Sequence, residues 1–128
     1  SYGELRREGL ECERTNRLNP SESRQVPYVE ELLGDGTLPT IAVSDNQIAV
    51  PDMIRQWVGG DYTVLGTDGF GRSDTRPNLR KFFEIDSQSI TLAALSSLVR
   101  SGQIGADVYE KAIKDLGVSK DREDITAL

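Results

Sequence analysis

The sequence of 128 residues contains no histidine, a single cysteine and few aromatic residues. Without histidine there is no imidazole general base, no histidine-dependent catalytic triad and no usual zinc ligand set. The one thiol, Cys12, excludes an intramolecular disulfide and a multi-cysteine metal site. These absences remove several common kinds of catalytic site.

Long hydrophobic runs and a basic charge excess are also missing. No apolar run approaches the roughly 20 residues of a membrane helix, and no signal peptide is visible. The net charge is -6, whereas a nucleic-acid ligand requires a basic surface. We therefore expect a cytoplasmic protein with neither membrane nor nucleic-acid partners. Because the chain starts with Ser1 rather than methionine, we expect a processed chain or a fragment.

Hydrophobic periodicity and turn residues predict helices that alternate with two short strands. The predicted strands cover residues 40–44 and 62–65, and the predicted helices cover residues 2–18, 27–36, 48–58, 75–85, 86–102 and 105–117. In the helix over 48–58 we expect Met53, Ile54, Trp57 and Val58 to face inward. Strands separated by a helix pair in parallel through a right-handed crossover, so the pattern predicts an α/β fold.

Two strands alone make a poor sheet. The sequence therefore predicts part of a larger α/β domain whose first strands precede Ser1. Residues 1–118 are assigned to this single domain. Residues 119–128 are assigned to a loose C-terminal tail.

A glycine-rich segment, LGTDGFGRSDTR, follows the second predicted strand, at the edge where α/β proteins bind ligands. Its G-x-x-G-x-G spacing matches neither the dinucleotide-binding nor the P-loop pattern, and its acids would repel a phosphate. A packing and interface loop is favoured, with Phe70 against a neighbouring surface and Arg72 paired with an acid. A role on the substrate side is the alternative. The candidate interface or active-site-rim loop comprises Asp68, Gly69, Phe70, Gly71, Arg72, Ser73 and Asp74.

Carboxylates and the thiol in the first helix are weaker candidates. Glu4, Glu8 and Glu11 lie at helical spacing and form either paired carboxylates or, as the neighbouring arginines favour, a solvated face. Cys12 is interpreted as a buried small hydrophobe rather than a nucleophile, because no histidine accompanies it.

Aromatic and acidic residues further along the chain also favour structural interpretations. Trp57 and the adjacent Phe82 and Phe83 fit core or interface anchors better than a base-stacking platform, given the acidic charge. A terminal acidic run is usually solvated rather than a cation site. This run comprises Asp121, Glu123 and Asp124.

Five segments of the chain together resemble one known family. They are LRREGLECERTNRLNP, VPYVEELL, IAVPDMIRQWV, DYTVLGTDGFGRSDTRPNLRKFFEID and ITLAALSSLVRSGQI. In this order, and over nearly the whole chain, they are similar to the C-terminal domain of the homodimeric type of thiamine-diphosphate-dependent pyruvate dehydrogenase component. The resemblance implies a transketolase-like C-terminal domain. Such a domain has a mixed or parallel sheet of about five strands with helices on both faces.

In that family the complete enzyme decarboxylates pyruvate and acetylates the lipoyl group of dihydrolipoyl acetyltransferase. Thiamine diphosphate and magnesium lie between the other two domains, at a dimer interface. The resemblance therefore implies no catalytic, cofactor-binding or metal-binding residue in this segment. It implies a structural and dimerisation role, with three partners: the rest of the enzyme chain, the homodimer partner and the acetyltransferase core.

Three further points qualify this resemblance. The GDG at residues 34–36 mimics the start of a diphosphate-binding motif, but no matching asparagine follows. Thr15 and Asn19 stand where the family usually has tryptophan and histidine, so no interface or channel role is carried over to them. The alternative function is a free-standing protein–protein interaction module without catalytic activity, docking through Trp57 and the helical faces.

Overall fold

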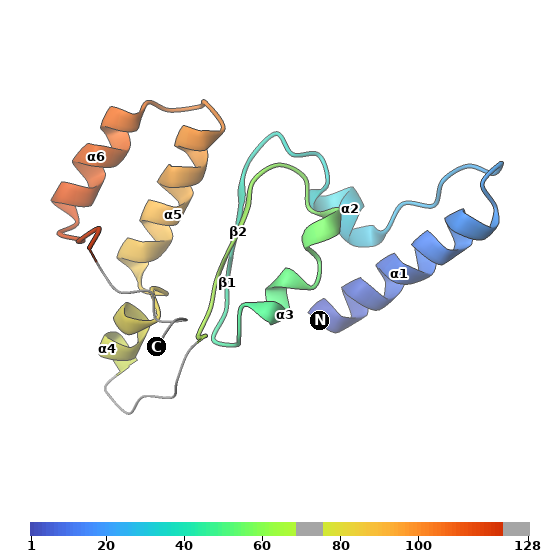
Figure 1. Cartoon of the computed structure of the whole chain (residues 1–128), viewed down its shortest axis with the longest axis horizontal. Helices are drawn as coiled ribbons and strands as arrows, with labels where there is room; N and C mark the ends of the chain where they lie inside the picture. The colour runs from blue at the N-terminus through green and yellow to red at the C-terminus, as the bar shows by residue number, and fades with distance from the viewer. Residues whose placement is uncertain (69–75, 122–128) are drawn as a thin grey trace.

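The computed structural model describes residues 1–68 and 76–121 (Figure 1). Helices and strands alternate along the chain, which confirms the predicted α/β class. The elements are α1 (Tyr2–Leu18), α2 (Tyr28–Leu33), β1 (Thr40–Val43), α3 (Ala49–Asp52), the 3-10 helix η1 (Arg55–Trp57), β2 (Tyr62–Leu65), α4 (Arg76–Phe82), α5 (Ser87–Arg100) and α6 (Ala106–Asp115).

The two strands form a parallel sheet between two groups of helices. Their register runs from Thr40 opposite Tyr62 to Val43 opposite Leu65, which confirms the predicted parallel pairing. Figure 1 shows α1, α2 and α3 on one side of the strands and α5 and α6 on the other. Because side chains alternate along a strand, β2 can contribute to both faces.

Helix α1 begins and ends at side-chain caps. The hydroxyl of Ser1 accepts a hydrogen bond from the backbone N–H of Glu4 at 3.3 Å, which satisfies one free donor of the first turn. At the other end, the amide side chain and the backbone N–H of Asn19 both donate to the carbonyl of Thr15, at 2.9 and 3.0 Å. Thr15 and Asn19, which stand where the resembled family usually has tryptophan and histidine, therefore form the end of this helix.

The segment 48–58 does not form the single helix that its periodicity predicts. The hydroxyl of Tyr62 donates to the carbonyl of Pro51 at 2.7 Å, a group that would accept from residue 55 in a continuous helix. The chain instead forms α3 and then η1. Ile54 and Trp57 are buried, as predicted, and Val58 packs against the core. The inward placement predicted for Met53 is wrong, because its side chain is 40% exposed.

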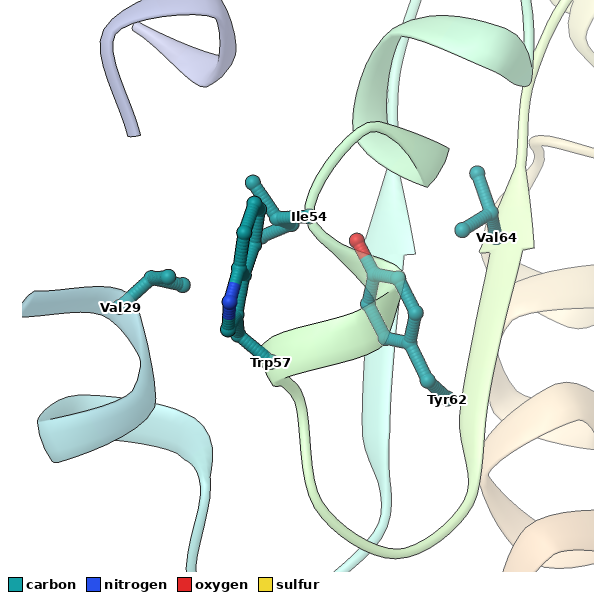
Figure 2. Packing of buried hydrophobic residues seen from close by; sticks show 5 residues of the cluster. All are labelled: Val29, Ile54, Trp57, Tyr62 and Val64. Carbon is teal, nitrogen blue, oxygen red and sulfur yellow. The ribbon is translucent and has the colours of Figure 1, made fainter. Parts of the chain in front are cut away.

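The hydrophobic core lies between the sheet, η1, α2 and α1. Figure 2 shows Ile54 and Trp57 between Val29 of α2 and Tyr62 of β2, with Val64 beyond them. All five side chains are at least nine-tenths buried. The indole Nε1 of Trp57 has no hydrogen-bond partner among the described residues, so the ring is held by packing.

A glycine lets α1 approach this core closely. A Cβ built at Gly9 would lie 2.5 Å from Cζ2 of Trp57, well inside van der Waals contact. A β-carbon at Gly3, on the same helix, would meet only the hydroxyl of Ser1 at 4.0 Å. The helix therefore packs against the indole at the one position where no side chain intervenes.

The opposite face of the sheet is covered by α5. Ser97 of this helix is fully buried, and its hydroxyl lies 3.3 Å from that of Thr63 on β2. Arg100 donates to the carboxylate of Asp61, just before β2, at 2.6 Å. The hydroxyl of Ser97 and the guanidinium of Arg100 lower the pKa of Asp61. Helix α6 packs on α5 and buries Ile113.

None of the helices in residues 1–68 and 76–121 combines the length and the apolar character needed to cross a membrane.

We expect Gly9→Ala to lower the free energy of unfolding of the chain, measured by urea titration, by about 1–3 kcal/mol, because the new methyl displaces Trp57. Gly3→Ala is the matched control, since it adds the same methyl to α1 in open space. It should raise stability by about 0.5–1 kcal/mol through helix propensity. Equal effects of the two substitutions would contradict the close packing at Trp57.

Candidate functional site

The two loops at the carboxyl ends of β1 and β2 are bonded to each other. The backbone N–H of Thr67 donates to the carbonyl of Asn46 at 3.0 Å, and its hydroxyl donates to the carbonyl of Asp45 at 2.7 Å. The backbone N–H of Ser44 donates to the carbonyl of Leu65 at 3.0 Å. We call residues 44–48 and 66–68 the carboxyl-edge loops. They lie where parallel α/β sheets usually place ligands.

Asp68 is the one residue of the predicted loop that the structure describes. Its Oδ1 accepts a hydrogen bond from the backbone N–H of Ile48 at 2.6 Å, in a partly buried position. Ile48 immediately precedes α3, so this carboxylate satisfies a free donor at the start of that helix. The other predicted residues, Gly69, Phe70, Gly71, Arg72, Ser73 and Asp74, lie outside the described residues. Their packing and pairing stay predictions.

Gly66 permits the two loops to meet. A Cβ at this position would lie 2.7 Å from the carbonyl oxygen of Asn46 and 3.0 Å from the backbone nitrogen of Ile48. Both of these are backbone atoms that cannot rotate aside. Absence of a side chain, rather than unusual backbone dihedrals, is therefore what this glycine supplies.

The bonds of the carboxyl-edge loops fix the position of the backbone at the ends of the strands. The carboxylate of Asp68, the hydroxyl and backbone N–H of Thr67 and the backbone groups that they bind are engaged in bonds that join one loop to the other. Such a clamp sets the direction in which the chain leaves β2. The glycine-rich segment indicated this region as a candidate site, but its sequence contains no signal for the bonds to Asn46 and Ile48. Both strands are followed by short polar residues, in SDN and GTD, and this is the signal that could have indicated a shared cluster.

The carboxylates of α1 are occupied within the helix and its neighbours. Arg7 binds Glu4 at 3.1 Å and Glu11 at 2.9 Å. Glu8 accepts from the thiol of Cys12 at 3.2 Å and from the backbone N–H of residue 28 at 3.1 Å. Burial first, and then Glu8, raises the pKa of the Cys12 thiol to about 11. Cys12 is buried, as predicted. Glu4 and Glu11 lie on a solvated, ion-paired face, whereas Glu8 is half-buried and does not belong to it.

Other residues that were singled out have structural places. Trp57 is 3% exposed, so the proposed docking through this side chain is wrong. The Phe82 and Phe83 rings form an edge-to-face pair with centroids 4.9 Å apart. In the GDG segment, Asp35 accepts from the backbone N–H of Thr37 at 2.7 Å. This bond closes a local turn.

No group of three potential metal-ligating side chains gathers anywhere in the described part of the chain, residues 1–68 and 76–121. A hollow of about 370 Å³ lies between β2, α5 and α6, with Leu65, Leu92 and Ile113 in its wall. The cation on its rim, Lys120, already pairs with Glu110 at 2.8 Å. Glu123 and Asp124 of the acidic run lie outside the described residues.

We expect Asp68→Ala to speed hydrogen exchange at the backbone amide of Ile48 and to destabilise the chain by about 1–2 kcal/mol, because a buried donor loses its acceptor. Asp68→Asn retains an oxygen at the same place and should protect that amide much better. Exchange at Ile48 that is the same in both variants would show that the carboxylate does not hold this loop.

We expect Cys12 to resist Ellman's reagent in the folded chain at about pH 8 and to react readily in urea, since only the thiolate is nucleophilic. The folded-state pKa of about 11 lies above the ordinary thiol value of 9.0. The folded state therefore holds the proton more tightly, and the associated stability is lost as the pH rises through 11. Fast labelling of the native chain at neutral pH would contradict this burial.

Comparison with known proteins identifies the family of this chain. A family model described as the transketolase-like TK C-terminal domain matches residues 6–86. The chain is 48% identical over 112 residues to the pyruvate dehydrogenase E1 component of Mycolicibacterium smegmatis, covering 88% of this chain and 12% of that protein. It is 47% identical over 123 residues to that of Pseudomonas aeruginosa and 42% identical over 123 residues to that of Escherichia coli K12, in each case covering 95% of this chain and 14% of the relative.

The chain thus spans less than one seventh of the relatives' length but is matched along most of its own. The family match covers both strands, α2, α3, η1, α4 and most of α1. It also covers the carboxyl-edge loops. The resemblance seen in the sequence is confirmed. The chain belongs to the transketolase-like C-terminal domain family.

Proposed function

We propose that this chain is a structural domain of the first component of a pyruvate dehydrogenase complex. The supporting observation is its identity of 42–48% to proteins named as the pyruvate dehydrogenase E1 component. In this proposal the full-length protein is a cytoplasmic homodimer that decarboxylates pyruvate. Thiamine diphosphate supplies the electron sink for that chemistry. The acetyl group then passes to the lipoyl group of dihydrolipoyl acetyltransferase.

The described residues do not fit a site for thiamine diphosphate and magnesium. Asp35, the one acid of the GDG segment, is bonded to its own turn. Gly36 packs against the backbone of Gly60, where an added Cβ would lie 2.9 Å from its nitrogen. The hollow of about 360 Å³ beside Asp35 is also lined by Glu30 and Glu31, whose carboxylates would repel a diphosphate. We therefore assign the cofactors to other parts of the enzyme and derive no catalytic step from this chain.

A structural role is supported by the uncovered edge of β1. The backbone N–H groups of Thr40 and Ser44 donate toward β2 at 2.9 and 3.0 Å, so alternate residues of β1 face that strand. Ile41 and Val43 therefore direct their backbone groups away from it. In the described part of the chain, no backbone hydrogen bond joins these two residues to a third strand.

The outer edge of β2 differs from that of β1. The guanidinium of Arg55 donates to the carbonyl of Tyr62 at 2.8 Å and lies 5.0 Å from the centre of its ring. A strand added there would have to displace this cation. Further strands of a larger sheet are therefore expected beside β1 rather than beside β2.

An apolar hollow lies beside β1 on the α1 side. Its volume is about 420 Å³, and its wall includes Tyr2, Leu5, Leu33, Ile41 and Ile54. Polypeptide that paired with β1 could fill this hollow with its own side chains. We propose that the preceding part of the enzyme chain does so, and that the domain thereby holds the carboxyl-edge loops against the dimer and its active site.

The test is a comparison of the full-length protein with the chain of 128 residues. We expect the full-length protein to reduce an artificial electron acceptor with pyruvate, dependent on added thiamine diphosphate and Mg²⁺. The isolated chain should show no turnover and no binding of thiamine diphosphate by calorimetry. Inactivity of the full-length protein with pyruvate, or cofactor binding by the isolated chain, would refute the proposal.

A further inference from the structure

Helix α1 carries a row of arginines on an exposed side that flanks its core-facing side. Arg6, Leu10, Arg14 and Arg17 follow one another at intervals of four, four and three residues, which places them along one line of the helix. The three arginines are exposed, and Leu10 is 38% exposed. We call these four residues the arginine stripe. At 1.5 Å per residue it is about 16 Å long.

In the described part of the chain, no carboxylate forms an ion pair with the arginines of this stripe. Arg7, on the neighbouring side of the same helix, binds two glutamates. Arg24 and Arg100 also form short ion pairs, with Glu30 at 2.7 Å and with Asp61 at 2.6 Å. By contrast, no described ion pair or hydrogen bond joins the side chains of the arginine stripe to an acid.

The surroundings leave the arginine stripe accessible. In Figure 1, α1 lies at one end of the described chain, and it packs against α2 and α3. At its first turn, Gly3 leaves open space beside the stripe, since a Cβ there would meet only the hydroxyl of Ser1. Among the described residues, nothing beyond the hydroxyl of Ser1 stands where a helix or loop of another molecule would meet this end of α1.

Charge and shape together indicate the kind of partner. Guanidinium groups bind carboxylates and phosphates through paired hydrogen bonds. The net charge of -6 for the whole chain would repel an extended polyanion such as nucleic acid. The partly exposed Leu10 between two arginines offers an apolar contact as well, which a protein surface can match.

We propose that the arginine stripe of α1 docks an acidic surface of a separate protein chain. That surface would carry carboxylates at matching intervals and one apolar side chain opposite Leu10. Three charges and one leucine make a polar contact of the kind found in transient rather than permanent interfaces. Association of this kind is accelerated by charge and weakened by salt. The inference goes beyond the proposed structural role and does not rest on it.

The experiment measures binding to the full-length protein by fluorescence anisotropy. The probe is a labelled helical peptide with glutamates at the spacing of the three arginines and one leucine, and its control has glutamine in place of glutamate. We expect Arg14→Glu with Arg17→Glu to weaken binding by about tenfold or more, and an increase in salt from about 50 to about 300 mM to weaken it similarly. The matched control is Lys111→Glu with Lys114→Glu, which makes the same charge change on an exposed face of α6 and should alter binding by less than about twofold.

Three results would overturn the proposal. The first is equal binding of the glutamate and glutamine peptides, and the second is an equal loss from the α6 control variant. The third is protection of Arg6, Arg14 and Arg17 from phenylglyoxal in the unchanged full-length protein, because the arginine stripe would then be covered by its own chain. The salt series and the labelling need no variant, so misfolding of a variant cannot mask the outcome.

Turnover of pyruvate in the same samples separates this inference from the proposed function. Loss of peptide binding with unchanged decarboxylation supports the arginine stripe as a docking surface. A full-length protein that binds the glutamate peptide but does not use pyruvate would refute the proposed function alone.

Discussion

The contact between the backbone of α1 at Gly9 and the indole of Trp57 determines how the described part of the domain is arranged. Trp57 is held by packing alone, and α1 closes one side of its ring. Val29 and Ile54 close others within the same cluster. Because η1 carries Trp57 and leads directly into β2, the position of this ring links the first helix to the sheet. A shift at the ring would be passed to both.

At the carboxyl ends of the strands, hydrogen bonds rather than packing hold the structure. The carboxyl-edge loops are joined through Asn46, Thr67 and the carboxylate of Asp68. Gly66 allows this because any β-carbon there would meet fixed backbone atoms. Different interactions thus stabilise the face of the sheet near α1 and the carboxyl ends of the strands. Apolar burial holds the side near α1, and directional hydrogen bonds hold the carboxyl-edge loops.

Periodicity in the sequence was sufficient for most of the fold. It predicted α1 to its last residue and both strands within a residue, because these segments follow a single repeat between clear caps and turns. It failed over 48–58, where the hydroxyl of Tyr62 takes the carbonyl of Pro51. That competing acceptor bond is made by a residue from the next strand, and no local pattern contains it.

The candidate site could be predicted only in location. A glycine-rich segment after a strand indicated the correct edge, whereas the partner of Asp68 depends on how two distant loops meet. The arginines at 6, 14 and 17 show the same limit of prediction from sequence. Their spacing is visible in the sequence, where nearby glutamates favoured a balanced face. That no described carboxylate bonds to them became apparent only when those glutamates were found bonded to Arg7, Cys12 and the start of α2.

The difference between the two sheet edges also bears on how the chain behaves when it is separated from other polypeptide. An uncovered strand is a template for pairing with its own copies, and proteins discourage this with charges or prolines along the edge. At β2 the cation of Arg55 serves that purpose. At β1 the outward backbone groups belong to Ile41 and Val43, with only Pro39 before them. Self-association of the isolated domain is therefore expected at β1 rather than at β2.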